Sequence, residues 1–198
     1  MTNLANDLGT EKISKLLIKQ AVPASIGILV MSLNMIVDTI FVGQWIGSLA
    51  IAAITVVLPI VFLISSIGMG IGIGGSSIIS RALGASKSDK AFLTFGNQIS
   101  MTLVLSIFFV LVGTFFCSSL LLLFGANGDI LTPATEYFHV VLYGVPFLAF
   151  AMMGNPVIRA EGKPRFAMYA MIIPAFTNIL LDIVFIKIFD WGMFGAGL

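Results

Sequence analysis

The sequence is poor in charge, in cysteine and in histidine, and each shortage narrows what the protein can be. Only 10% of its 198 residues are charged and 59% are hydrophobic, whereas a soluble domain has about 25% charged residues. The net charge of +1 leaves no basic surface for nucleic acid and no acidic tail. The single cysteine, Cys117, excludes an internal disulfide and a multi-cysteine metal site. Together with a mean hydropathy of +1.10, these shortages indicate an integral membrane protein.

Long apolar runs predict an all-α membrane protein. A helix needs about 20 apolar residues to cross a bilayer. Suitable runs occupy residues 16–43, 47–80, 91–123, 135–158 and 166–188. The second run is longer than a bilayer needs, which indicates an entry turn, a tilt or a break at Pro59. We therefore expect a bundle over 16–198, with five complete transmembrane helices and the start of a sixth after residue 190.

Residues 1–15 are polar and of mixed charge, and they lack the pattern of a cleavable signal peptide. We interpret them as an N-terminal arm. Nine of the ten basic residues fall at this same end of the predicted bundle. They are Lys12, Lys15, Lys19, Arg81, Lys87, Lys90, Arg159, Lys163 and Arg165. By the positive-inside rule this end is cytoplasmic, so we expect a cytoplasmic N-terminus, with Arg81 and Arg159 as orientation and headgroup anchors. Lys187 alone falls at the other end.

Two carboxylates interrupt the apolar runs. Asp38 lies in the first predicted span and Asp182 in the fifth, and an asparagine precedes each by four residues, Asn34 and Asn178. Residues i and i+4 share one face of a helix, so each span presents an amide beside a carboxylate. A carboxylate in a membrane span costs roughly 2.5–3.5 kcal/mol on insertion scales, and such groups normally face a protein interior or a water-filled cavity. Both spans run outward and both aspartates come late in them, so we expect the two faces to meet in the outer half of the membrane.

Neighbouring polar residues leave several roles open. Thr39 and Thr177 could add hydroxyl ligands or bond their own helices. Asn34 and Asn178 could instead join helices by hydrogen bonds, as buried asparagines often do. A structural role in which each aspartate bonds a hydroxyl or amide is the alternative to a functional pair. His139, the only histidine, lies near the outer end of the fourth span, and we favour an interfacial role over a proton relay.

Glycine and proline gather inside the predicted spans. Residues 68–75 contain five glycines, which favours close helix packing, with a hinge or a cavity lining as the alternative. Five prolines remove backbone hydrogen bonds inside spans and predict kinks. They are Pro23, Pro59, Pro146, Pro156 and Pro174.

Four short motifs, in order along the chain, resemble those of one family. They are Asp38-Thr39-Ile40-Phe41-Val42-Gly43, Ile79-Ser80-Arg81-Ala82-Leu83-Gly84, Arg159-Ala160-x-Gly162 and Asn178-x-x-x-Asp182. Together they look like the N-terminal half of a MATE (multidrug and toxic compound extrusion) transporter. The resemblance implies two six-span lobes, of which this chain would be one, and export of organic, often cationic compounds against an inward H⁺ or Na⁺ gradient. It also implies a cation-coupling role for Asp38, Asp182 and Asn178, and a bend of the first span at Pro23.

The sequence departs from this pattern in two places. Many relatives have proline after the carboxylate of the fifth span, whereas this chain has Ile183, which puts the local helix break in question. The chain also stops where a sixth span would begin, so we expect a fragment of a longer protein.

From these observations we expect a cation-coupled antiporter that exports organic, cationic drugs across a prokaryotic cytoplasmic membrane. Asp38, Asp182 and Asn178 would carry the coupling ion, and would be metal ligands if that ion is Na⁺. Asn34, Thr39 and Thr177 would support them. We expect no cofactor other than H⁺ or Na⁺. The expected partners are small organic substrates, the bilayer and a missing C-terminal half.

The alternatives are a lipid-linked precursor flippase and a non-transporting membrane subunit. A flippase of this architecture should carry cationic side chains in its cavity to hold a pyrophosphate, whereas the intramembrane charges here are acidic. We do not expect an enzyme, since the sequence has no HExxH motif, no nucleophile that His139 could serve and no aspartate cluster on a cytoplasmic loop.

Overall fold

The structure is a computed structural model that describes residues 12–198, and all its regular elements are helical. In chain order they are α2 (Ile13–Trp45), α3 (Ser48–Gly84), α4 (Ser88–Phe115), α5 (Cys117–Leu123), η1 (Gly128–Ile130), α6 (Leu131–Ala160), α7 (Pro164–Asp182), η2 (Ile183–Ile188) and α8 (Gly192–Gly197). Five helical segments are long and apolar enough to cross a membrane. The predicted all-α membrane fold is therefore confirmed.

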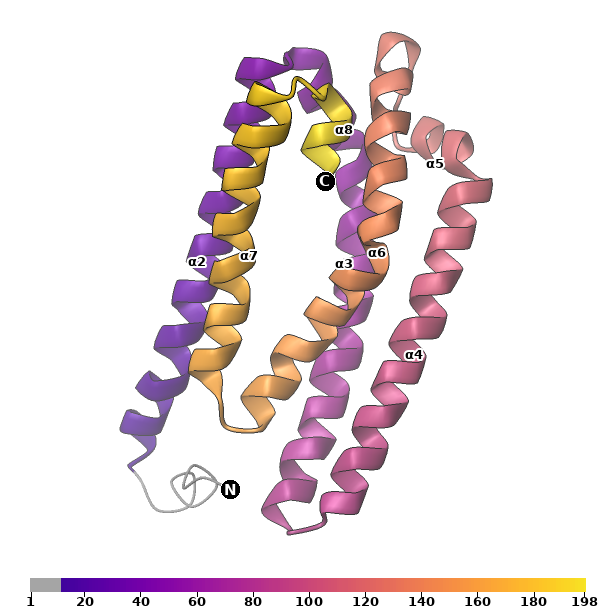
Figure 1. Cartoon of the computed structure of the whole chain (residues 1–198). Helices are drawn as coiled ribbons and strands as arrows, with labels where there is room; N and C mark the ends of the chain where they lie inside the picture. Colours follow the sequence, from indigo (N-terminus) through magenta and orange to yellow (C-terminus); the bar gives the residue numbers. More distant parts are fainter. Residues whose placement is uncertain (1–11) are drawn as a thin grey trace.

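The observed helix ends differ from some of the predicted ones, although the predicted helices are present. The first helix starts at Ile13, inside the expected polar arm, because Ile13, Leu16 and Leu17 continue its apolar spacing. The rest of that arm, residues 1–11, lies outside the described residues. The expected span over 91–123 is wrong only in its last eight residues, since α4 ends at Phe115 and α5 turns away from its axis (Figure 1). The 28 residues of α4 already reach about 42 Å, more than the bilayer core needs.

The glycine-rich part of α3 packs closely on α6. A Cβ atom on Gly68 would lie 3.0 Å from the carbonyl oxygen of Ala149, and one on Gly72 would lie 2.6 Å from that of Met153. Both glycines are buried, and α3 continues as one α-helix through them and through Pro59. The close-packing interpretation is therefore confirmed, and the break considered at Pro59 does not occur.

A buried polar side chain joins α4 to the same part of α3. The Gln98 Nε2 atom donates to the carbonyl oxygens of Ile71 at 2.7 Å and Gly72 at 3.3 Å. Gly75 makes room for it, because a Cβ atom there would overlap the Gln98 amide. Sequence reasoning passed over Gln98, since one uncharged amide in an apolar run gives little sign of which way it faces.

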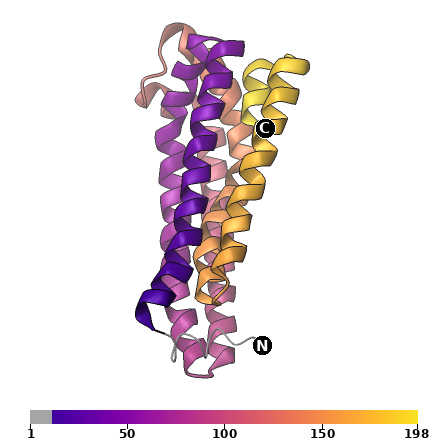
Figure 2. The ribbon, with the colours of Figure 1, turned by 90° about the vertical axis from the view of Figure 1, so that its left-hand side faces the viewer.

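The helices form two groups, which contact each other toward both ends of the bundle. Helices α3, α4 and α6 pack together, while α2 packs chiefly on α7 (Figures 1 and 2). Helix α6 changes direction part-way along, as expected for a helix that contains Pro146 and Pro156 (Figure 1). The start of α2, the α3–α4 loop and the α6–α7 loop share one end of the bundle (Figure 1). This is the end at which the sequence gathers its basic residues.

Candidate functional site

Helices α2 and α7 carry the two intramembrane carboxylates and lie side by side (Figures 1 and 2). Both helices start at the basic end of the bundle and run in the same direction, so residues late in each reach a similar level. Asp182 is only 2% exposed, and Asp38 is half-buried. The two carboxylates lie within electrostatic range of each other. The structure therefore brings together the two faces that the sequence singled out.

A chain of amides connects the two helices inside this cluster. Asn34 Nδ2 on α2 donates to Asn178 Oδ1 on α7 over 2.9 Å. Asn178 Nδ2 then donates to Asp182 Oδ1 over 3.4 Å. Each asparagine–aspartate pair is one helical turn apart, which lets an amide and a carboxylate share a face. Asn178 thus contacts both helices with one side chain and sets the orientation of the Asp182 carboxylate.

Three oxygen atoms of the cluster are buried and have no hydrogen-bond partner within residues 12–198. They are Asn34 Oδ1, Asp38 Oδ1 and Asp182 Oδ2. A buried acceptor without a donor is costly. A proton on one carboxylate would relieve part of this cost, and a hard cation could be bound by several of these atoms, since such cations prefer oxygen ligands. The described residues contain no group of three or more His, Cys, Asp or Glu side chains arranged to hold a metal ion. A metal cation at this cluster would therefore need amide oxygens beside the two carboxylates.

A third helix contributes to the cluster. Tyr137 on α6 is half-buried and lies within electrostatic range of both Asp38 and Asp182. Sequence reasoning missed this residue because a tyrosine in an apolar span normally indicates core or interface packing. The nearby acid Glu136 was noticed instead, and it is exposed.

The regular helix ends directly after Asp182. Residues Ile183–Ile188 form a π-helix, η2. The question raised by Ile183 is therefore answered, since the chain changes its helical geometry at this point without a proline. Single π turns inside helices often occur at functional sites. Here the change of helix type alters the angle, around the helix axis, at which the side chains after Asp182 project.

The two threonines lie outside the amide chain. Thr39 Oγ1 donates to the Met35 carbonyl over 2.8 Å, and Thr177 Oγ1 donates to the Ile173 carbonyl over 2.9 Å. Both threonines are exposed. Each hydroxyl thus donates to a carbonyl of its own helix, which was one of the two roles considered from the sequence.

At the basic end, α2, α6 and α7 meet around Pro23. Pro23 and Gly27 are buried one turn apart on α2, and a Cβ atom on Gly27 would lie 2.8 Å from Met171 Sδ on α7. Arg159 on α6 donates from Nε to Asn155 Oδ1 at 3.0 Å and from Nη2 to Met171 Sδ at 3.8 Å. Arg159, interpreted from sequence as a headgroup anchor, thus turns toward α7. Helix α2 runs unbroken through Pro23 in this structure.

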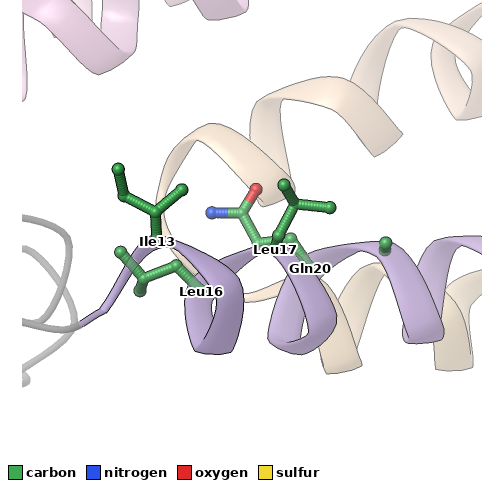
Figure 3. A pocket seen from close by; sticks show the side chains of 5 residues that line it. Ile13, Leu16, Leu17 and Gln20 are labelled. Atoms are coloured by element: carbon green, nitrogen blue, oxygen red, sulfur yellow. The ribbon is translucent and has the colours of Figure 1, made fainter.

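The remaining candidates lie away from the cluster. His139 is exposed, and Arg81 Nε donates to the Ser77 carbonyl of its own helix at 3.0 Å. An open hollow lies at the start of α2, far along the helix from Asp38 (Figure 3). Its lining is one amide among apolar side chains: Ile13, Leu16, Leu17, Gln20 and Ala21. These lining residues include no titratable side chain.

Comparisons with known proteins agree with this architecture. The MatE family model matches residues 23–184. A probable multidrug resistance protein of Bacillus subtilis is 28% identical over 174 residues, covering 88% of this chain and 37% of the relative. An FAD transporter of Shewanella oneidensis is 31% identical, covering 86% of this chain and 37% of the relative. A multidrug export protein of Staphylococcus saprophyticus is 32% identical, covering 90% and 40%.

Solved structures show the same arrangement. The MATE multidrug transporter DinF-BH is 41% identical, with a TM-score of 0.90 over 96% of this chain and 42% of that one. An outward-facing MATE family transporter of the MOP superfamily is 31% identical, with a TM-score of 0.86 over 92% of this chain and 40% of that one. The chain thus spans about two fifths of the length of its relatives. With the family model matched across most of its length and with five apolar helices, this chain is an integral, multi-pass membrane protein that belongs to the MATE family.

Proposed function

We propose that the chain forms the amino-terminal lobe of a cation-coupled antiporter that exports organic cations. Asp38, Asp182 and Asn178 bind the coupling ion, which is H⁺ or Na⁺. Asn34 and Asn178 hold the α2 and α7 faces together around it. The observation that carries the proposal is the buried cluster itself, in which two carboxylates on different helices have oxygen atoms without a partner among the described residues.

The chemistry of the cluster fits a reversible cation site. Two carboxylates near one another in a low-dielectric setting repel, and a shared proton or cation relieves that repulsion. Oxygen ligands from Asp38, Asp182 and the amides suit Na⁺ equally well. Binding of the cation changes the local charge by one. This change shifts the equilibrium between two conformations of α2. In the cycle we propose, α2 bends at Pro23 as the cation loads, and the exported compound leaves.

The charge of the cargo is open to a second candidate. A relative that is 31% identical to this chain is described as an FAD transporter, and FAD is an organic anion. The acidic cluster favours a cationic cargo, because opposite charges attract in a low dielectric. The test below therefore offers both kinds of compound.

The proposal is tested in proteoliposomes that contain the protein as its native gene encodes it, loaded with ethidium or with FAD. Imposed Na⁺ and pH gradients are applied separately, and the release of each compound is followed. We expect gradient-driven ethidium efflux. Asp38→Asn should reduce it at least about tenfold, since a neutral amide cannot exchange the charge of a cation.

A matched control tests whether the loss of any carboxylate lowers efflux, or only the loss of one in the cluster. Glu136→Gln removes an exposed carboxylate from α6 and should leave efflux unchanged. Membrane level and thermal unfolding must match wild type for both variants. Efflux at the wild-type rate by Asp38→Asn would contradict the coupling role, and FAD release with no ethidium release would favour the second candidate.

The rest of the transporter and its orientation are part of the same proposal. The relatives are more than twice as long as the matched region, so a second lobe would complete the cleft. An intact mass well above 21.1 kDa for the native membrane protein is the expected result. We propose that the basic end of the bundle faces the cytoplasm. An impermeant maleimide should then label Asn127→Cys, but not Ala85→Cys, from outside the cell.

A further inference from the structure

One basic side chain stands apart from the other nine. Lys187 lies in η2, at the opposite end of the bundle from the remaining lysines and arginines. Its Nζ atom lies 5.3 Å from the centre of the Trp45 ring, a cation–π contact. Trp45 is the last residue of α2, so this contact joins the end of α2 to η2, the segment that continues from α7.

The contact lies directly beyond the cluster on both helices. Trp45 follows Asp38 by seven residues, which corresponds to about 10 Å along the helix axis. Lys187 follows Asp182 by five residues. Along the α2 axis the contact thus lies about one Debye length beyond Asp38, and screening is weaker where part of the path is protein.

The π-helix decides which way Lys187 points. In a regular α-helix a residue five positions after Asp182 would be turned about 140° away from it around the axis. The wider turn of a π-helix brings position i+5 back toward the side of position i. The same change of geometry that follows Asp182 thus carries the Lys187 side chain to α2.

Aromatic rings hold both partners in place. Phe41 stacks on Trp45 with ring centres 4.3 Å apart. On the other side, Phe185 stacks on Trp191 at 5.0 Å, within η2 and the turn that follows it. Large rings stacked in this way restrict the orientation of Trp45 and of η2, the two elements that the Lys187 contact joins.

We propose that Lys187 determines the affinity of the acidic cluster for its coupling cation. Its charge, tethered on Trp45, opposes the approach of a cation to Asp38 and Asp182 from the outer end, and so weakens binding there. A transporter needs its ion to leave again, and a fixed positive charge beside the site favours release. Lys187 acts through its electric field, without touching either carboxylate. This inference rests on the proposed cation coupling.

Other titratable groups at that end are Asp129, Glu136, His139 and Asp190, all of them exposed, together with Tyr137 beside the acids. They stay unchanged in every variant below. A shift caused by Lys187 is therefore measured against a constant background.

The test measures the half-saturating concentration of the coupling cation for ethidium efflux in proteoliposomes. Na⁺ is titrated at fixed pH, and H⁺ is titrated without Na⁺. For the ion that drives efflux, Lys187→Met should lower the half-saturating concentration about two- to tenfold at low ionic strength. The shift should shrink when a non-coupling salt is added. The maximal rate should change little, and Lys187→Arg, which keeps the charge, should match wild type.

Matched variants keep the outcome clear. Lys90→Met removes the same charge at the basic end and should shift nothing. Lys187→Gln repeats the loss of charge with a polar side chain, in case the methionine variant folds poorly. An unchanged half-saturating concentration in both neutral variants would overturn the proposal and leave Lys187 as an interfacial anchor. A wild-type protein that responds to neither ion would overturn the proposed coupling itself, which is a different result.

Discussion

Asn178 uses both ends of its amide. Its oxygen accepts from Asn34 and its nitrogen donates to Asp182. Asn34, by contrast, makes one contact to this chain of groups and keeps a buried oxygen without a partner in the described residues. The two asparagines look alike in sequence, each four residues before an aspartate, yet only one of them touches a carboxylate.

This difference predicts unequal effects of alanine. Asn178→Ala removes two hydrogen bonds and should lower stability more than Asn34→Ala. A double-mutant cycle should give a coupling energy between the two of about 0.6 kcal/mol and no more than about 1.7 kcal/mol, the range found for side-chain hydrogen bonds in membrane bundles. Thermal unfolding in detergent supplies the four values.

The exposed Asn127, at the end away from the basic loops, provides the control. Asn127→Ala should change stability little, since its amide makes only a 3.5 Å contact within its own loop. Equal losses for Asn34→Ala and Asn178→Ala would contradict the amide chain.

At the scale of the element, the packing of α3 depends on which face of the helix each glycine occupies. Gly72 faces the backbone of α6, whereas a Cβ atom on Gly74 would meet nothing within 4 Å. Both residues belong to the same glycine-rich segment, and nothing in their local sequence separates them. Their roles differ because adjacent helices approach only one side of α3.

Opposite outcomes are therefore expected for the same substitution. Gly72→Ala should destabilise the bundle by about 1–3 kcal/mol, since its Cβ would lie 2.6 Å from a backbone oxygen that cannot move aside easily. Gly74→Ala should be neutral or should stabilise by up to about 1 kcal/mol, because alanine favours a helix. Unfolding of both variants in the same detergent is the measurement. A larger loss for Gly74→Ala would show that α3 presents another face to α6.

At the scale of the whole molecule, the helices divide into the α2–α7 pair and the α3–α4–α6 group. The pair holds the acidic cluster on one level and the Pro23 region on another. A cycle in which α2 bends at Pro23 requires the two levels to move relative to each other, and the contact between Gly27 and Met171 lies beside that bend.

A disulfide across this contact should stop the cycle. The Cβ atoms at positions 27 and 171 would be 3.7 Å apart, which suits a disulfide. In a Cys117→Ala background, Gly27→Cys with Met171→Cys should form the bond on oxidation and lose gradient-driven efflux. Reductant should restore it. Gly70→Cys with Met171→Cys should not cross-link, and full efflux by the oxidised first pair would contradict bending at Pro23.

Hydropathy, helical periodicity and charge placement are local properties, and they were enough to predict the number of spans, the end that gathers basic residues and the pairing of each aspartate with an asparagine. They also predicted that Asp38 and Asp182 would meet, because two costly charges at one level must share an interior. The family followed from short motifs in order.

Other features depend on contacts between residues far apart in the chain, and only the packed structure shows them. The break after Phe115, the choice of Gly68, Gly72 and Gly75 as contact points, the approach of Tyr137 and the placement of Lys187 on Trp45 are all of this kind. No local pattern specifies them, because the face a residue presents depends on which helix lies opposite, and helix association is decided by close packing over the whole bundle.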